Sequence, residues 1–428
     1  MGERTPRKLV RAVASLSAGV LASVTLAACG GSDGGVPEIN VYNGTSAIGF
    51  NDGPDSVIAT CNKAAEGKYK IVGNLLPSDA DGQREQFVRR LAAKDDGMDL
   101  LGMDVTWTAE FAEAGWINEL TDAQKEVATK DTLQPTIDTA MWKDKLYGVP
   151  KHTNVQLLWF RKSLVPTPPK TWDEMVEMSK KLKADGKPYV IGLTAAQYEG
   201  YVVGFNTILS SMGGTLVNED STEVTVDDTT VEALGVLHDL ATGGLASKSL
   251  SNSQEPEVFG SMQSGEAAFI INWPYVLSNM KTADPDIAKD LGYTKLPEFK
   301  SGEAPRATLG GMNYAISKYS KHPKEAFDAA LCMRNPESQL KIALSAGEPP
   351  VAPSVYADPE FQKAYPMGPE MLAELETAVS RPITPLYQNI STIVSTTLSP
   401  PSSIDPEKTA KELEDSIQQA IDGKGILP

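Results

Sequence analysis

Histidine and cysteine are both scarce in this chain of 428 residues, which contains three of each. The histidines stand far apart, at positions 152, 238 and 322, and this spacing excludes a histidine-rich zinc site and the HExxH helix. The chain also lacks the GxxxxGKS/T loop and a strand followed by GxGxxG, so no motif indicates nucleotide chemistry. Residues 79–82 begin like a calcium loop, but position 88 is valine where that loop needs glutamate, and we interpret the segment as a turn.

Basic residues are outnumbered, with 39 Lys and Arg against 56 Asp and Glu and a formal charge of −17. A field of this sign repels phosphate backbones, so we expect no nucleic-acid partner. Hydrophobic residues make up 41% and charged residues 22% of the chain, a composition that excludes disorder and fibrous repeats. The length suggests two or three domains of ordinary size.

Long hydrophobic runs are missing as well, apart from one near the beginning. Residues 12–25 form an apolar run that is short for a membrane span and follows basic residues at positions 4, 7, 8 and 11, which predicts a signal peptide over residues 1–28. Residues 26–29 read LAAC and resemble a bacterial lipobox. We therefore expect Cys29 to carry a lipid, residues 29–36 to form a flexible tether, and the protein to be anchored on the outer face of the cytoplasmic membrane. The alternatives are an uncleaved anchor helix and an ordinary secretory signal with a chance cysteine.

The two remaining cysteines, Cys61 and Cys332, face an oxidising compartment if the chain is exported. We expect them to form a disulfide. Because they stand far apart in the chain, this bond requires discontinuous domains rather than domains in series. The alternative is a pair of buried thiols, and neither interpretation needs a metal.

Strand-like and helix-like segments alternate after residue 37, which predicts an α/β fold with a largely parallel sheet. We expect strands at residues 39–42, 69–72, 98–103, 267–271 and 308–316, and helices at residues 55–65, 83–94, 108–114, 197–212 and 229–241. Residues 147–160 predict one long strand that runs from one domain into the next, and residues 308–316 cross back. Thr171, followed by Glu174 three residues later, predicts a capping box at the start of a helix.

Four aromatic residues stand at predicted ends of strands or beginnings of helices, near short polar residues. They are Tyr42 beside Asn43, Trp107 near Asp104, Tyr198 beside Glu199, and Trp273 beside Asn272. Aromatic rings stack on the C–H faces of sugars while carboxylates and amides bind the hydroxyls, so the combination indicates a carbohydrate site. Taken singly, each aromatic residue is more often part of a core. The carboxylates of Asp104, Glu199 and Glu255 also leave open the possibility that the protein is a glycosidase. Such an enzyme needs two carboxylates close together in the fold, and they can be far apart in the sequence.

Longer blocks of sequence carry a family resemblance that covers residues 29–428. The lipobox, residues 145–160, 168–175, 213–214, 267–274 and 310–313 together resemble the sugar-binding lipoproteins of bacterial ABC importers, a maltose-binding-protein-like family of solute-binding proteins. Residues 103–116, 272–274, 381–388 and 420–428 are similar to the trehalose-binding lipoproteins of actinobacteria. The chain departs from that group in a shorter stretch between Trp273 and Gly310, where loops that border the ligand would lie.

The resemblance implies a type II periplasmic-binding-protein fold, with two discontinuous α/β lobes joined by crossing strands and a ligand cleft between them. The N-terminal lobe would comprise residues 37–150 and about 310–350, and the C-terminal lobe residues 151–309 and about 351–428. Such a protein is a monomer without a cofactor or catalytic activity. It closes on a disaccharide, with trehalose favoured here, and delivers the sugar to ABC permease subunits driven by a cytoplasmic ATPase.

Similarity also assigns roles to single residues. Asp104 and Asn154 would bind the sugar from the first lobe and the crossing strand, Trp273 would stack on a glucose ring, and Gly311 would offer its backbone. Glu255 and Arg381 would bind hydroxyls from the second lobe. Tyr42, Asn43 and Glu199 join this set by position only, and the family's cysteine pair supports a Cys61–Cys332 disulfide inside one lobe.

Other functions stay open from the sequence. The chain could be a secreted glycoside hydrolase that acts on a small oligosaccharide, or a binding protein of the same fold for another sugar or a glycerophosphodiester. A cell-wall adhesion or scaffolding lipoprotein is the third class. For the site residues, Asp104 could be a helix cap and Arg381 part of a surface ion pair.

Overall fold

The computed structural model describes residues 35–44 and 53–424. The predicted signal peptide, Cys29 with its predicted lipid and most of the predicted tether lie outside the described residues, as do the last four residues of the chain. None of the described helices is long and apolar enough to cross a membrane.

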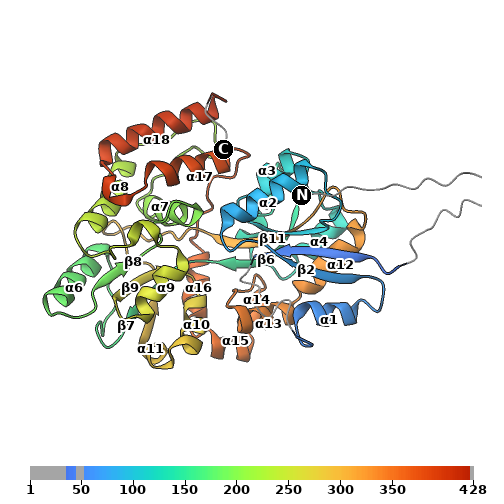
Figure 1. The fold of residues 1–428 in the computed structure, drawn as a ribbon, viewed down its shortest axis with the longest axis horizontal. Helices are drawn as coiled ribbons and strands as arrows, with labels where there is room; N and C mark the ends of the chain where they lie inside the picture. The colour runs from blue at the N-terminus through green and yellow to red at the C-terminus, as the bar shows by residue number, and fades with distance from the viewer. Residues whose placement is uncertain (1–34, 45–52, 425–428) are drawn as a thin grey trace, which may run out of the picture. The chain divides into compact units, whose positions relative to one another are not determined.

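Two mixed sheets form the framework of the fold (Figure 1). The five-stranded sheet has the order β2-β1-β3-β11-β6 and consists of β1 (Glu38–Asn43), β2 (Lys70–Leu75), β3 (Leu100–Asp104), β6 (Gly148–Asn154) and β11 (Gly310–Ile316). The four-stranded sheet has the order β10-β7-β9-β8 and consists of β7 (Leu157–Arg161), β8 (Val190–Gly192), β9 (Ala267–Asn272) and β10 (Leu291–Thr294). A small sheet pairs β4 (Met141–Trp142) with β5 (Lys145–Leu146). We call the parts built around the five-stranded and the four-stranded sheets the first and the second lobe.

Helices connect nearly all of these strands. Before β6 they are α1 (Val57–Ala64), α2 (Ala80–Ala92), α3 (Thr108–Glu113), α4 (Asp122–Thr129) and α5 (Gln134–Asp138). Between β7 and β11 they are α6 (Trp172–Ala184), α7 (Glu199–Ser211), α8 (Asp228–Thr242), η1 (Leu250–Asn252), α9 (Glu255–Gln263), α10 (Tyr275–Ala283) and α11 (Pro285–Asp290). After β11 they are α12 (Pro323–Met333), α13 (Pro336–Ala346), α14 (Pro353–Tyr356), α15 (Pro359–Ala364), α16 (Gly368–Leu375), α17 (Tyr387–Thr397), η2 (Pro401–Ser403) and α18 (Pro406–Ile421).

The five-stranded sheet is less parallel than the sequence predicts. β1 is parallel to β2 and β3, but β11 is antiparallel to both of its neighbours, β3 and β6. The reason is that β11 returns from the second lobe, far along the chain, and enters the sheet between β3 and β6. The predicted α/β class is confirmed. The prediction of a largely parallel sheet is wrong, because two of the four strand pairs are antiparallel.

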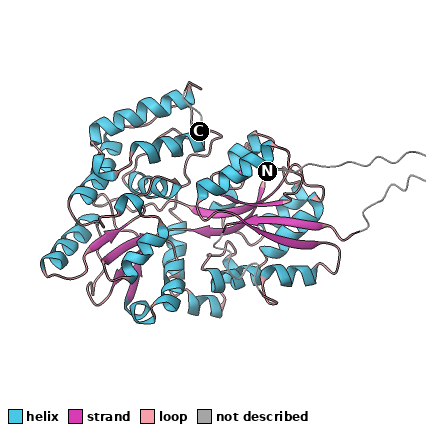
Figure 2. Ribbon diagram, in the orientation of Figure 1, coloured by secondary structure: helices cyan, strands magenta, loops and turns pink. Residues whose placement is uncertain are grey.

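Helices cover both faces of the five-stranded sheet (Figure 2). Successive side chains of a strand point to opposite faces, so each strand contributes to two cores. Ile39 and Val41 belong to a core with residues of α1 and α12, whereas Tyr42 belongs to a second core with residues of α2 and α3. The second lobe has a core of its own around β7, β9 and α7.

The predicted strand over residues 147–160 is in fact two strands, β6 and β7. β6 pairs with β11 in the first lobe, and β7 pairs with β9 and β10 in the second. The buried residues Val155 and Gln156 separate them, and there the chain leaves one sheet for the other. The prediction that this segment connects the lobes is thus confirmed, but not its continuity.

The crossing strands are joined by a third segment that follows α13. His152 of β6 forms an isolated bridge with Pro350, and the Thr153 N–H donates to the Pro349 carbonyl at 3.1 Å. Nζ of Lys151 lies 2.7 Å from a carboxylate oxygen of Glu348, and both side chains are buried. A buried ion pair is costly to break on one side only, so these contacts fasten the crossing region.

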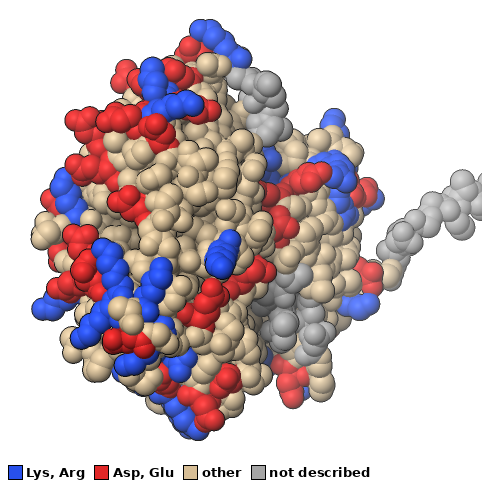
Figure 3. Space-filling view, turned by 60° about the vertical axis from the view of Figure 1, so that its left-hand side comes forward, with Lys and Arg blue, Asp and Glu red and all other residues tan. Residues whose placement is uncertain are grey.

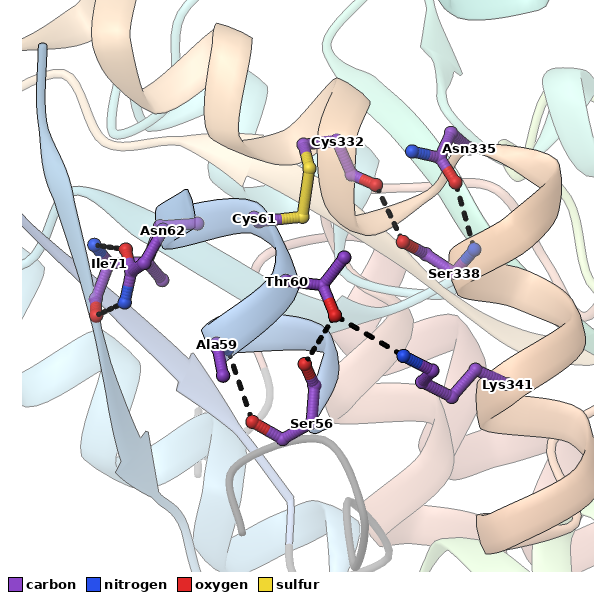
Figure 4. The surroundings of a disulfide bond; sticks show 10 residues. All are labelled: Ser56, Ala59, Thr60, Cys61, Asn62, Ile71, Cys332, Asn335, Ser338 and Lys341. Carbon is purple, nitrogen blue, oxygen red and sulfur yellow. Dashed lines mark hydrogen bonds between the residues drawn. A yellow bond between two sulfur atoms is a disulfide. The ribbon is translucent and has the colours of Figure 1, made fainter. Parts of the chain in front are cut away.

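A disulfide joins Cys61 on α1 to Cys332 on α12, as predicted (Figure 4). The sequence separation is 271 residues, yet both helices pack against the same face of the five-stranded sheet. Asn62, next to the disulfide, exchanges two hydrogen bonds with the backbone of Ile71 on β2, at 3.1 and 2.6 Å. The disulfide therefore links the first helix of the first lobe to a helix that follows the crossing strands in the chain.

Two local predictions at helix starts need correction. The turn predicted for residues 79–82 is wrong, because Asp79 is the N-cap of α2 and accepts a hydrogen bond from the Gly82 N–H at 2.8 Å. At α6, Thr171 caps the helix as predicted by accepting from the Glu174 N–H at 3.2 Å. The carboxylate of Glu174, however, accepts from the Lys170 N–H at 2.7 Å rather than from Thr171.

Charged side chains of both signs are mixed on the surface. Figure 3 shows Lys and Arg interspersed with Asp and Glu on the face in view, with no separate basic area.

Candidate ligand-binding site

Arg381 lies between α16 and α17 and is buried, which excludes the surface ion pair considered from the sequence. Its guanidinium donates hydrogen bonds to the Glu199 carboxylate, to Oδ1 of Asp104 at 3.4 Å and to the Leu309 carbonyl at 3.4 Å. Asp104 ends β3 in the first lobe and Glu199 begins α7 in the second, so this one side chain connects the lobes. Burial alone would lower the pKa of Arg381, but Tyr387 and the two carboxylates raise it above its usual value, and the group stays charged.

Asp104 has two tasks in this arrangement. Besides Arg381, its Oδ1 accepts hydrogen bonds from the backbone N–H of Thr106 at 3.0 Å and from the Thr106 hydroxyl at 2.8 Å. These bonds stabilise the turn from β3 into α3, as short carboxylates commonly do two residues before the donor. About 20% of the Asp104 side chain stays exposed, so it can also meet a ligand.

Glu199 is more deeply buried, and both of its carboxylate oxygens are used. One accepts from Arg381 and from the hydroxyl of Tyr387, and the other accepts from the hydroxyl of Ser391. Burial raises the pKa of the Glu199 carboxyl, and the Arg381 guanidinium opposes this shift. With its acceptor positions occupied by protein donors, Glu199 holds Arg381 in place and is poorly available to a ligand.

Trp273 and Glu255 form a second group in the second lobe. Nε1 of Trp273 donates to one carboxylate oxygen of Glu255 at 3.4 Å, and the Tyr198 hydroxyl donates to the other. Asn272, which ends β9, accepts from the Trp273 N–H at 2.8 Å and donates to the Glu255 carbonyl at 3.1 Å. Burial raises the pKa of Tyr198, so its hydroxyl remains a donor. An aromatic ring and a carboxylate are thereby fixed side by side.

The glycine pair at the start of β11 connects this group to the crossing strands. A Cβ atom at Gly310 would lie 3.0 Å from the Trp273 ring and 3.4 Å from Cβ of Asn154, so the indole packs directly over the strand. Gly311 has φ +130°, and a Cβ there would lie 2.4 Å from the His152 carbonyl oxygen. Only glycine allows this close approach. Oδ1 of Asn154 is buried without a hydrogen-bond partner among the described residues.

The structure does not bring Tyr42, Asn43 and Trp107 into these groups. Tyr42 packs in the core beneath α2, where its ring lies 4.5 Å from the Arg90 guanidinium. Asn43 is buried beside Gly102, and neither amide atom has a partner among the described residues. Trp107 stacks on Phe111 in the same core as Tyr42. An aromatic residue at the end of a strand fits a core as well as a site, and here the core interpretation holds for both rings.

A small cavity touches Arg381 between the lobes. Its walls include Val105, Thr106 and Ala109 from the first lobe, together with Leu309 and residues 380–383. The volume is about 10 Å³, which is room for about one water molecule. The space at this side of the guanidinium is thus far too small for a disaccharide.

Sequence reasoning missed Tyr387 and Ser391 as partners of the site. They lie four residues apart on α17, a spacing that places two side chains on the same helix face. Two polar side chains on one face of a helix that begins shortly after Arg381 were the signal that the sequence offered. No group of three or more His, Cys, Asp or Glu side chains that could hold a metal ion occurs within residues 35–44 and 53–424.

Two lobes with separate sheets, joined by crossing strands and meeting at a buried charged group, define a two-lobed α/β protein of the periplasmic-binding type. The T. maritima structure titled "Maltose bound T. maritima MalE3" has this fold, with a TM-score of 0.80 and 26% identity over 89% of this chain and 99% of that chain.

Sequence comparison gives the same class. The profile of the family described as "Bacterial extracellular solute-binding protein" matches residues 57–340. A Deinococcus radiodurans relative named "Probable ABC transporter-binding protein" is 28% identical over 340 residues, which are 76% of this chain and 80% of the relative. The galactooligosaccharide-binding protein of Bacillus subtilis is 24% identical over 357 residues, covering 80% and 81%. The chain belongs to the bacterial extracellular solute-binding protein family.

Proposed function

We propose that this protein is the substrate-binding lipoprotein of an ABC sugar importer and that it captures a disaccharide by closure of its two lobes. Family membership supports an extracytoplasmic binding protein that serves a permease. The names of a relative and of a similar structure mention galactooligosaccharide and maltose, which favours a sugar over other solutes.

One observation carries the proposal: Arg381 contacts carboxylates from both lobes and donates to the Leu309 carbonyl, and Trp273, which is held by Glu255, packs over the following residue, Gly310. A neutral sugar needs donors and acceptors in fixed directions together with an aromatic face, and these residues supply all three. A ligand that contacts both lobes binds the closed arrangement better than the open one, and it therefore shifts the population toward closure.

Trehalose is the disaccharide we favour, on the resemblance of residues 103–116, 272–274 and 381–388 to trehalose-binding lipoproteins. In this proposal Trp273 stacks on a glucose ring, while Asp104, Asn154, Glu255 and Arg381 bind hydroxyls and Gly311 offers its backbone. We also propose that a lipid on Cys29 anchors the protein to the membrane and that the protein acts as a monomer.

Calorimetric titration of the purified protein tests the proposal. The panel is trehalose, maltose, sucrose, glucose, a glycerophosphodiester and an amino acid, with free glucose assayed after each titration. Saturable binding of trehalose without release of glucose is the expected result. Binding of another member would move the substrate assignment, release of glucose would favour the hydrolase, and no binding at all would contradict a sugar-binding function.

A further inference from the structure

Asp81 makes contacts that cross from the first lobe to the second. It lies in the first turn of α2, which packs on the five-stranded sheet. Its carboxylate accepts a hydrogen bond from Nε2 of Gln388 on α17 at 3.4 Å. Burial raises the pKa of this carboxyl, and the backbone N–H of Glu199, the first residue of α7, lies close enough to oppose that shift. Both groups belong to the second lobe.

α7 has no cap of its own. Its N-cap residue, Tyr198, makes no side-chain hydrogen bond to the helix, because its hydroxyl bonds to Glu255. The first N–H groups of a helix lack partners within the helix, and a carboxylate is the preferred group to satisfy them. Asp81 takes this place for Glu199 from the other lobe. Asp79, two residues earlier, serves its own helix instead.

The first turn of α7 supports both parts of the candidate site. Tyr198 bonds to the carboxylate that fixes Trp273, and the next residue, Glu199, holds Arg381. A change in the position of this turn would therefore disturb the aromatic and the charged parts of the site together.

We propose that Asp81 is a positioning residue that couples lobe closure to the order of the binding site, because it caps α7 only when the lobes are together. This inference rests on the proposed function, namely that closure accompanies sugar binding. When the lobes separate, α7 loses its cap and the supports of Trp273 and Arg381 loosen. When they close, the cap forms and the site becomes rigid.

Three variants test the proposal: Asp81→Ala, Asp81→Asn and, as the matched control on the same helix turn, Asp79→Ala. Trehalose affinity is measured by calorimetry and its dissociation rate by stopped-flow tryptophan fluorescence. We expect Asp81→Ala to weaken binding about five- to tenfold, mainly through faster dissociation. Asp81→Asn keeps an acceptor oxygen and should lose less. Asp79→Ala should lower the melting temperature without changing affinity. An Asp81→Ala affinity within about twofold of the wild type, or an equal loss in Asp79→Ala, would overturn the proposal.

X-ray scattering of the ligand-free proteins separates positioning from direct contact with the sugar. If Asp81 acts as a cross-lobe cap, Asp81→Ala shifts the ligand-free protein toward a larger radius of gyration, whereas Asp79→Ala does not. A loss of affinity with unchanged ligand-free scattering would show that Asp81 acts by touching the ligand, and would overturn the inference. If the wild type binds no sugar in the panel, the proposed function fails, and the scattering comparison still decides whether the cap holds the lobes.

Discussion

Arg381 is a charged side chain whose removal would have two effects at once. Truncation to alanine would leave the Glu199 carboxylate buried with its main counter-charge gone. Removing one partner of a buried ion pair costs about 3–5 kcal/mol of stability in other proteins. A loss of sugar binding in Arg381→Ala would therefore mix misfolding with lost contacts. Trp273, which is only partly buried, is the better residue for testing the site.

Replacement of Trp273 by alanine should weaken disaccharide binding about tenfold or more, which is about 1.4 kcal/mol or more. The indole offers the stacking face, and Glu255 holds it at the proposed site. Calorimetry measures the effect. Trp142→Ala, on the small β4–β5 sheet, is the control that removes a tryptophan elsewhere. Equal affinities in all three proteins would remove Trp273 from the site.

Glu374 on α16 is expected to make stability depend on pH. Burial raises the pKa of its carboxyl to about 7, although a hydrogen bond from the Leu296 N–H and the charge of Lys295 oppose the shift. Because the folded-state pKa lies above the unfolded one, the native protein favours the protonated form, and this stabilisation is lost as pH rises through about 7. The free energy of unfolding should fall by roughly 3 kcal/mol from this group between about pH 4.5 and pH 8.

Denaturant unfolding at several pH values tests this expectation. Glu374→Gln should show a flatter pH profile than the wild type, since an amide does not titrate. Glu376→Gln, an exposed neighbour at the end of the same helix, should keep the wild-type profile. A wild-type slope in Glu374→Gln would mean that another group is responsible.

At the scale of single residues, the sequence predicted the charged part of the site better than the aromatic part. Asp104 and Arg381 come from blocks with a family resemblance, and the structure brings them together with Glu199, which was placed by position only. Tyr42 could not be decided from the sequence, because the alternation along β1 determines which core it enters, and both faces of the sheet are covered. Whether these residues bind a sugar stays a prediction.

Among the elements, α1 and α12 depend on each other through the Cys61–Cys332 bond. Replacing both cysteines by alanine should lower the free energy of unfolding by roughly 2–5 kcal/mol, since the bond restrains a long loop of the unfolded chain. Thermal melting with and without reductant measures this effect. Affinity for sugar should stay unchanged wherever the variant is folded, because the hydrogen bonds of Arg381 and Trp273 go to residues outside α1 and α12. A parallel loss of affinity would show that the disulfide also shapes the site.

Elements with strong local signals were predictable, and short ones were not. The strand at residues 267–271 is confirmed as β9, in which every residue is buried. β8 and β10 have three and four residues, too few to show a periodicity, and they exist because β9 and β7 offer them hydrogen-bonding edges. The division of residues 147–160 into β6 and β7 was equally invisible, since a strand-like segment has the same pattern whether it lies in one sheet or in two.

At the scale of the whole molecule, charge should decide which ligands are admitted. The protein carries a formal charge of −17, and the candidate site itself holds the carboxylates of Asp104, Glu199 and Glu255 against the single guanidinium of Arg381. An anionic sugar must approach against this field. We expect trehalose 6-phosphate to bind at least about tenfold more weakly than trehalose, with a difference that shrinks as salt is added.

A neutral trehalose analogue substituted at the same oxygen separates charge from size in that comparison. If the neutral analogue binds like trehalose while the phosphate does not, charge is the cause. Equal binding of trehalose and its phosphate would contradict the expectation and would point to a cationic group other than Arg381 beside the bound sugar.

The central position of β11 determines the order in which the molecule can be completed. β11 lies between β3 and β6 in the first lobe, yet residues 155–309 separate it from β6 in the chain. A ribosome that adds about 5–20 residues per second needs roughly 10–30 s for that distance. During this time the emerging chain holds β3 and β6 with unpaired edges, which are sites of aggregation. The first lobe therefore stays incomplete until residues 155–309 have been made, and its unpaired strands need protection until β11 pairs with them.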